Sequence, residues 1–143
     1  MLKVRQFSKN DWQRFKIQPA QLHEINFCQA IPSSAISLVD DNGEIMAVLG
    51  DCEVYKGRGV AMAFISANAG RHMTTIVRLI KRMIDVGMAK FGYERLEMSV
   101  LNGFLPGERM AEMLGFECEG LMRKYFKGKD YKLYAKTKTS GDK

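Results

Sequence analysis

The clearest pattern in the chain is a strand–helix–strand unit between Gly59 and Phe116. Two short apolar runs, Val60 to Ile65 and Leu96 to Leu101, are typical of strands, whereas Arg71 to Phe91 repeats apolar residues with a helical period. This order predicts two parallel strands joined by a crossover helix. A loop of small residues, Ser66 to Gly70, directly follows the first strand. Because ligands bind at the C-terminal edge of the strands in open α/β sheets, we expect a binding site at this loop.

The predicted long helix has one apolar face. Its apolar positions recur at helical spacing and comprise Met73, Ile76, Val77, Ile80, Met83, Ile84 and Met88. Polar residues such as Arg78 and Lys81 fall on the other side. A stripe of this kind predicts a helix that lies on a sheet and buries Met73, Ile76, Ile80, Met83 and Ile84.

Other elements are expected on both sides of this unit. The predicted elements are a strand over Leu2–Phe7, helices from Ser8 and over Ala20–Ala30, a hairpin of Ala35–Val39 and Glu44 to about Tyr55, a helix over Pro106–Leu114, and a hairpin of Phe116–Phe126 and Tyr131–Lys136. The turn Asp40–Gly43 contains Asn-Gly, a strong hairpin signal. The order β-α-α-β-β-β-α-β-α-β-β predicts an α/β fold with a mixed, mostly antiparallel sheet of six to seven strands flanked by helices.

Length and composition favour a single domain. The 143 residues are 46% hydrophobic and 27% charged, which suits a globular domain over residues 1–136 followed by a flexible basic tail, 137–143. No run of eighteen apolar residues exists, and the N-terminus has no apolar leader, so we expect neither a membrane span nor a signal peptide. The three cysteines lack metal-type spacing, so we expect a reduced cytoplasmic protein without a metal site.

The chain is basic, with a formal net charge of +6. Such a charge permits an anionic partner, either nucleic acid or a phosphorylated cofactor. Several lysines lie in the tail and in the turn Lys127–Lys129, where solvation alone accounts for them. We therefore do not expect nucleic acid as the partner, and a homodimer is left open.

The C-terminal half resembles a known family. Tyr93-Glu94-Arg95-Leu96-Glu97-Met98-Ser99-Val100, then Asn102, then Met113-Leu114-Gly115-Phe116 follow the closing motif of the GCN5-related N-acetyltransferase (GNAT) superfamily. The element order matches over nearly the whole chain, while the residues match over about the last third. The resemblance implies the acyl-CoA N-acyltransferase fold, transfer of an acetyl group from acetyl-CoA to a primary amine, and acetyl-CoA as co-substrate.

The same resemblance implies a cofactor site at the start of the long helix. Members of the family pair the pantetheine arm with the strand before the loop, which points to Phe64 and Ile65. They hold the pyrophosphate on the first N–H groups of the helix, which lack internal partners and favour an anion. The implied cofactor-binding residues are therefore Phe64, Ile65, Gly70, Arg71, His72, Met73, Thr74, Thr75 and Asn102.

The loop departs from the family pattern. That pattern usually reads Gln or Arg, two residues, Gly, one residue, then Gly or Ala. Arg71 matches the first position, whereas Thr74 and Ile76 stand where the glycines are expected. Degenerate versions of this fold occur in small proteins of short-tailed bacteriophages, and the departures resemble those.

The catalytic positions depart as well. Many relatives place a Tyr in the short helix as proton donor, but that position holds Ala111, and Asn102 lies two residues upstream of the usual Asn. The strand Val60–Ile65 has no Glu to serve as base. The candidates that remain are Glu97 as a base acting through water, Asn102, and Tyr125 as proton donor.

Each of these candidates has an alternative reading. Glu97 can equally be a solvated strand carboxylate, Arg71 and His72 an exposed helix start, and Tyr125, with Tyr131 and Tyr134, part of the packing of the hairpin. Two functions stay open on the sequence alone. One is an N-acetyltransferase, and the other is a catalytically silent binding or structural protein on the same scaffold, of the phage or virion-associated kind.

Overall fold

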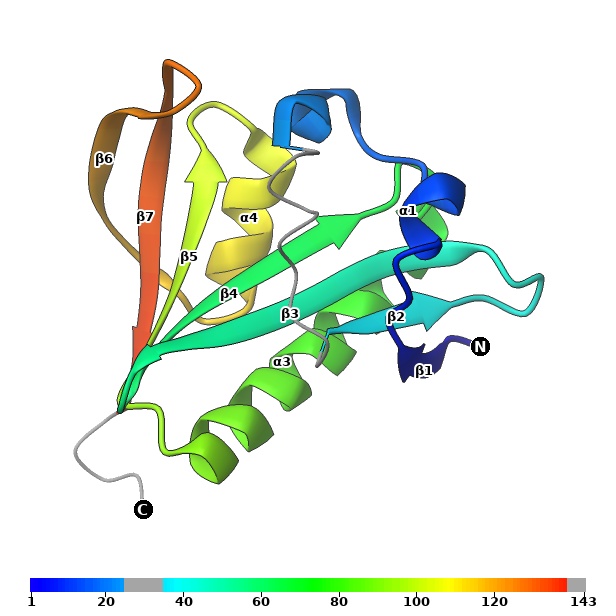
Figure 1. The fold of residues 1–143 in the computed structure, drawn as a ribbon, viewed down its shortest axis with the longest axis horizontal. Coiled ribbons are helices and arrows are strands. Elements are labelled where there is room, and N and C mark those ends of the chain that lie inside the picture. Colours follow the sequence, from blue (N-terminus) through cyan, green and yellow to red (C-terminus); the bar gives the residue numbers. More distant parts are fainter. Residues whose placement is uncertain (25–34, 139–143) are drawn as a thin grey trace. The chain divides into compact units, whose positions relative to one another are not determined.

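The computed structural model describes residues 1–24 and 35–138 (Figure 1). Its elements, in chain order, are β1 (Lys3–Gln6), α1 (Asp11–Arg14), the 3-10 helix η1 (Pro19–Glu24), β2 (Ile36–Val39), β3 (Ile45–Tyr55), β4 (Arg58–Ile65), the 3-10 helix η2 (Gly70–His72), α3 (Met73–Phe91), β5 (Arg95–Leu101), α4 (Leu105–Met113), β6 (Glu117–Phe126) and β7 (Lys129–Thr137). The helix predicted over Ala20–Ala30 begins as η1, and its remainder lies outside the described residues.

The strands form one sheet in the order β1-β2-β3-β4-β5-β7-β6. β1–β2, β2–β3, β5–β7 and β6–β7 pair antiparallel, whereas β4 and β5 pair parallel through Arg58–Val60 and Arg95–Glu97. The parallel pair is joined by α3, as the strand–helix–strand pattern predicts. The predicted fold class, a mixed and mostly antiparallel sheet with helices, is confirmed.

The described chain divides into two compact units. The first contains Met1–Asp51 and Met62–Ile76, and the second contains Cys52–Ala61 and the chain from Val77 onward. A single domain over residues 1–136 stays a prediction. Of the predicted tail, Thr137 is the last residue of β7, and residues 139–143 lie outside the described part.

The first unit has an aromatic core. Phe15, Ile45, Val48 and Phe64 are buried together. The ring of Trp12 meets the rings of Phe15 and Phe64 edge-on, with centroids 5.7 and 5.6 Å apart. Edge-to-face pairs of this kind add to the free energy gained from burial. This core anchors the end of β4, where the predicted cofactor segment begins.

A buried carboxylate ties β1, α1 and β2 together in the first unit. Asp11 accepts two hydrogen bonds of 2.8 Å from the guanidinium of Arg5, one of 2.9 Å from the backbone N–H of Ser8 and one of 2.9 Å from the hydroxyl of Ser37. Burial alone would raise the pKa of Asp11, but these hydrogen bonds outweigh it, so the pKa is lowered.

In the second unit, α4 lies against β5 (Figure 1). Met110, Ala111 and Leu114 of α4 are buried, as are Leu96, Met98 and Val100 of β5. The apolar stripe of α3 behaves largely as predicted, because Ile76 and Ile80 are buried while Met73, Met83 and Ile84 are partly buried.

Gly59 allows β4 to approach its neighbours closely. A Cβ atom at this position would lie 2.7 Å from Cζ of Tyr93 and 3.1 Å from Cδ1 of Leu96. Gly59 faces Leu96 in the parallel pairing of β4 with β5. Only a residue without a side chain fits this position without displacing the Tyr93 ring.

Candidate functional site

The predicted cofactor segment begins at the end of β4. Phe64 and Ile65 are buried, and the carbonyl of Ile65 accepts a hydrogen bond of 3.0 Å from the side-chain amide of Gln18. The next two backbone N–H groups are also held, that of Ser66 by the carbonyl of Met46 and that of Ala67 by the carbonyl of Lys16, both at 2.8 Å. These hydrogen bonds hold the start of the loop in a fixed position within the first unit.

The loop turns sharply into the helix. The hydroxyl of Ser66 accepts from the backbone N–H of Asn68 at 3.0 Å, and η2 is closed by bonds from His72 to Ala69 and from Met73 to Gly70. No described residue accepts the backbone N–H groups of Gly70 and Arg71. Unpaired N–H groups at a helix start are donors suited to an anion.

Space and charge at this helix start also suit an anion. A Cβ atom on Gly70 would meet no atom within 4 Å. The first turns contain no acidic residue, and Arg71 is exposed, with no ion-pair partner among the described residues. Thr74 and Thr75 are exposed as well, so their hydroxyl groups are accessible from solvent.

His72 contributes a buried nitrogen. Among the described residues, its Nε2 atom has no hydrogen-bond partner although it is shielded from solvent. A buried polar atom without a partner is uncommon in a native protein. The buried nitrogen of His72, the open space at Gly70 and the exposed Arg71 are compatible with a phosphate-bearing cofactor at this segment.

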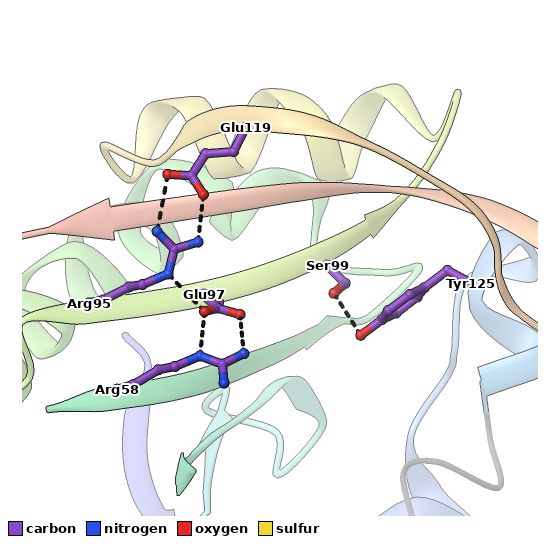
Figure 2. A network of polar contacts seen from close by, with 6 residues as sticks. All are labelled: Arg58, Arg95, Glu97, Ser99, Glu119 and Tyr125. Atoms are coloured by element: carbon purple, nitrogen blue, oxygen red, sulfur yellow. Dashed lines mark hydrogen bonds and ion pairs between the residues drawn. The ribbon is translucent and has the colours of Figure 1, made fainter. Parts of the chain in front are cut away.

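The second unit holds the three predicted catalytic residues, and Glu97 forms ion pairs there. Its carboxylate accepts hydrogen bonds of 2.6 and 2.9 Å from Arg58 and of 2.7 Å from Arg95 (Figure 2). The bonds from Arg58, opposed in part by burial and reinforced by the bond from Arg95, lower the pKa of Glu97 to about 2. A carboxylate with so low a pKa is a poor proton acceptor near neutral pH, which argues against its predicted role as base.

The network extends to β6. Arg95 also forms a bidentate ion pair with Glu119, with N–O distances of 3.1 and 2.5 Å (Figure 2). Arg58, Arg95 and Glu119 were not among the residues expected from the sequence. The charge alternation Arg95-Glu97 on one strand was the available signal, because residues two apart on a strand share a face.

Asn102 and Tyr125 are both exposed in the second unit. Asn102 lies in the turn after β5, where its backbone N–H donates to the carbonyl of Asp130 at 3.0 Å. The hydroxyl of Tyr125 lies 3.5 Å from that of Ser99, the outer limit of a hydrogen bond (Figure 2). Tyr131 and Tyr134 are buried, and burial raises the pKa of Tyr134. Of these three tyrosines, only Tyr125 is exposed.

The structure therefore gathers the predicted residues in two sets. Phe64 to Thr75 form one continuous segment of the first unit, and Glu97, Asn102 and Tyr125 belong to the second. Ala111, at the family's usual Tyr position, is fully buried in α4.

Within the described residues no group of three or more His, Cys, Asp or Glu side chains could hold a metal ion. No helix in this part of the chain has the length and apolar character needed to cross a bilayer.

Comparison of the whole structure with solved structures gives extensive matches. A GCN5-related N-acetyltransferase from Kribbella flavida shares 16% identity, with a TM-score of 0.69 and coverage of 96% of this chain and 98% of that one. The chain has the GNAT fold. Ard1 from Thermoplasma volcanium matches with a TM-score of 0.76 at 13% identity, covering 97% and 99% of the two chains. The ribosomal-protein-S5-alanine acetyltransferase from Vibrio fischeri matches with a TM-score of 0.70 at 15% identity, covering 99% and 96%.

The GNAT fold is thus established by three-dimensional similarity. No protein-family model matches the sequence, and no curated protein matches it. The resemblance inferred from the closing motif is confirmed at the level of fold, while its bacteriophage variant stays a prediction. The segment Ala69–Thr75 lies between β4 and the first turns of α3, the region in which the resemblance implies a cofactor site.

Proposed function

We propose that this protein is an N-acetyltransferase that moves an acetyl group from acetyl-CoA to a primary amine. The observation that carries the proposal is η2, the turn directly before α3, where N–H groups without a partner among the described residues, open space at Gly70 and the exposed Arg71 lie together in a chain with the GNAT fold. A reducing cytoplasmic setting belongs to the proposal, and the free, exposed Cys52 and Cys118 suit it.

The helix start would hold the pyrophosphate of CoA. The N–H groups of Gly70 and Arg71 are donors, and the positive end of the helix dipole favours an anion. The guanidinium of Arg71 adds a charge-assisted contact. The hydroxyl groups of Thr74 and Thr75 are further donors. The exposed guanidinium of Arg71 has no acidic partner among the described residues, and a diphosphate would supply the counter-charge.

Acetyl transfer requires a neutral amine, a polarised thioester carbonyl and a proton for the leaving thiolate. Backbone N–H groups at the end of β4 would polarise the carbonyl. The neutral amine nitrogen attacks the carbonyl carbon and releases a proton to water, the C–S bond breaks, and Tyr125 donates its hydroxyl proton to the thiolate sulfur and is then reprotonated from solvent. Glu97 has no part in this scheme as a base, because its ion pairs with Arg58 and Arg95 lower its pKa to about 2 and make it a poor proton acceptor near neutral pH.

A silent binding protein on the same scaffold is the second candidate. Two observations favour it. The position of the family's usual proton-donating Tyr holds the buried Ala111, and the carboxylate of Glu97 is paired with Arg58 and Arg95, so neither position supplies an acid or a base. This alternative performs no acetyl transfer whether or not it binds CoA, so binding and turnover must be measured separately.

Titration calorimetry with CoA tests the binding step. A charge-assisted contact is worth about 1.5–3 kcal/mol, so Arg71→Ala should weaken binding about tenfold to a hundredfold. Arg78→Ala is the matched control, because Arg78 is an exposed cation on α3, further from Gly70, without a partner among the described residues. Equal affinity of the parent protein and Arg71→Ala would remove the role of Arg71, and a parent protein that does not bind CoA would overturn the whole site.

An acetylation assay with a panel of primary amines tests the chemistry. If the parent protein turns over, Tyr125→Phe should lower kcat by about a hundredfold while leaving the KM for acetyl-CoA unchanged, in line with the usual contribution of a positioned acid. CoA binding without acetylation of any amine in the panel would favour the silent protein. Unchanged turnover in Tyr125→Phe would exclude Tyr125 as the proton donor.

A further inference from the structure

The pairing of β6 with β7 is interrupted near the end of β6. Met122 pairs with Tyr131, and Phe126 pairs with Lys129. Between these two pairs β7 has the single residue Asp130, whereas β6 has three residues, which we call the bulge: Arg123, Lys124 and Tyr125. A bulge breaks the ladder of backbone hydrogen bonds and changes the direction of the side chains on it, and bulges are frequent next to active sites. The bulge therefore decides where the candidate proton donor points.

The bulge brings Tyr125 to the face of the sheet on which Tyr131 lies. Met122 is directly opposite Tyr131, so these two side chains share a face. In a regular strand Tyr125, three residues after Met122, would point to the other face. Its ring centroid instead lies 5.5 Å from that of Tyr131, and its hydroxyl lies 3.5 Å from that of Ser99 (Figure 2). The position of Tyr125 beside Ser99 thus depends on the bulge.

The middle residue of the bulge, Lys124, is held by a side chain of the opposite strand. Its φ of 50° lies in the left-handed region, which is unfavourable for a residue with a side chain. Its backbone N–H donates a hydrogen bond of 2.9 Å to the carboxylate of Asp130. A bond to an ionised acceptor is stronger than a bond between neutral groups. The side chain of Asp130 therefore stabilises the backbone conformation that directs Tyr125.

The backbone of Asp130 contacts a second segment, the turn after β5. Its carbonyl accepts a hydrogen bond of 3.0 Å from the backbone N–H of Asn102. The next N–H of this turn, that of Gly103, donates to the buried carboxylate of Glu108 at 2.7 Å, and Glu108 is paired with Lys132 at 2.6 Å. Asp130 thus uses its carboxylate for the bulge and its carbonyl for the turn, so a change of its side chain separates the two contacts.

We propose that Asp130 is a positioning residue, whose carboxylate holds the bulge and thereby keeps Tyr125 in place as proton donor. The inference rests on the proposed acetyl transfer, in which Tyr125 protonates the leaving thiolate. Asp130 transfers no proton in this scheme. Its contribution is geometric, because a displacement of a reacting group by about 1 Å is enough to lower the rate strongly.

Amide hydrogen exchange measured by NMR tests the bond without any turnover. In Asp130→Ala the amide of Lys124 should exchange about tenfold faster, because a hydrogen bond to a charged group is lost. The amide of Asn102 is the control within the same molecule and should change little, since the carbonyl of residue 130 remains. Asp130→Asn keeps an acceptor oxygen and should stay within about threefold of the parent protein. An unchanged rate at Lys124 in Asp130→Ala, or faster exchange of both amides, would overturn the proposal.

The acetylation assay tests what Asp130 does for Tyr125. Asp130→Ala should lower kcat by about tenfold and leave the KM for acetyl-CoA unchanged, whereas Asp130→Asn should retain most of the rate. Adding Asp130→Ala to Tyr125→Phe should lower kcat no further, because a positioning residue has no effect once the group that it positions is gone. A further tenfold loss in the double variant, or equal losses in Asp130→Ala and Asp130→Asn, would contradict the positioning role.

Failure of this proposal is distinguishable from failure of the proposed function. A parent protein that acetylates no amine in the panel would count against the acetyl transfer alone. The position of Tyr125 is then measured directly, by the nuclear Overhauser effect between its ring and that of Tyr131. This effect should be present in the parent protein and in Asp130→Asn and should be lost in Asp130→Ala. An effect of equal strength in Asp130→Ala would exclude Asp130 as the residue that holds Tyr125.

Discussion

The ion pairs of Glu97 allow a quantitative prediction for the second unit. Replacing Glu97 by Gln removes the negative charge shared by Arg58 and Arg95, which approach it within 2.6 and 2.7 Å. Two guanidinium groups would then face each other around a neutral amide. We expect Glu97→Gln to lower the free energy of unfolding at pH 7.

The magnitude follows from the pKa of Glu97. Its folded value of about 2 lies below the ordinary value of 4.5. Each pKa unit corresponds to about 1.4 kcal/mol, which sets an upper limit of about 3 kcal/mol. The side chains of Arg58 and Arg95 are 32% and 29% exposed, so solvent screens the pairs. We therefore expect a loss of about 1–2 kcal/mol.

The pH dependence has a defined sign. Because the folded pKa of Glu97 is depressed, its contribution to stability is fully present above about pH 4.5 and is lost as the pH falls toward about 2. Urea denaturation of the parent protein and Glu97→Gln from pH 7 to pH 3 should show curves that converge as the pH falls. The difference at pH 3 should be smaller than that at pH 7.

Glu117→Gln is the matched control, because Glu117 is an exposed carboxylate on β6 without an ion-pair partner among the described residues. It should change the free energy of unfolding by less than about 0.5 kcal/mol. A Glu97→Gln variant as stable as the parent protein at pH 7, or a difference that grows as the pH falls, would refute the assignment of the ion pairs.

Two further substitutions probe other parts of the fold. Asp11→Asn should lower the free energy of unfolding, measured by urea denaturation, by about 3 kcal/mol, because Arg5 and the buried hydroxyl of Ser37 lose their carboxylate partner. A loss below about 1 kcal/mol would contradict this. Gly59→Ala should lower the melting temperature, because its Cβ would lie 2.7 Å from the Tyr93 ring, at a cost of about 1–3 kcal/mol in stability. Adding Tyr93→Leu to this variant should recover part of that loss, and no recovery would exclude the clash as its cause.

The sequence determined the elements and their order. The apolar stripe of α3 with its 3.6-residue period and the alternation in β5 arise because a helix or strand must bury one face. This requirement sets the spacing of apolar residues within each element, so it can be recognised in a short stretch of sequence. The buried Ile76 and Ile80 and the parallel pair β4–β5 follow from it. The apolar spacing was less informative near residue 20. The sequence predicts a helix over Ala20–Ala30, whereas the structure has a 3-10 helix that begins at Pro19.

The tertiary structure decided the role of each polar residue. Glu97 alternates away from the apolar residues of its strand, and this pattern fits a catalytic base, a solvated carboxylate or an ion pair equally well. Its partner Arg58 lies 39 residues earlier in the sequence. Only the register that sets Val60 opposite Glu97 brings them together, and strand register depends on contacts across the whole sheet.

The tyrosines of the last hairpin show the same division. The sequence predicts Tyr125 as proton donor, but Tyr125, Tyr131 and Tyr134 all lie in strand-like segments whose alternation fits the packing of the hairpin as well. The structure buries the last two and leaves Tyr125 exposed beside Ser99. Tyr125 lies on β6, the last strand in the sheet order, whereas Tyr131 and Tyr134 lie on β7, which pairs with a strand on each side. Local alternation fixes which elements form, whereas the packing of distant segments fixes which side chains remain available for chemistry.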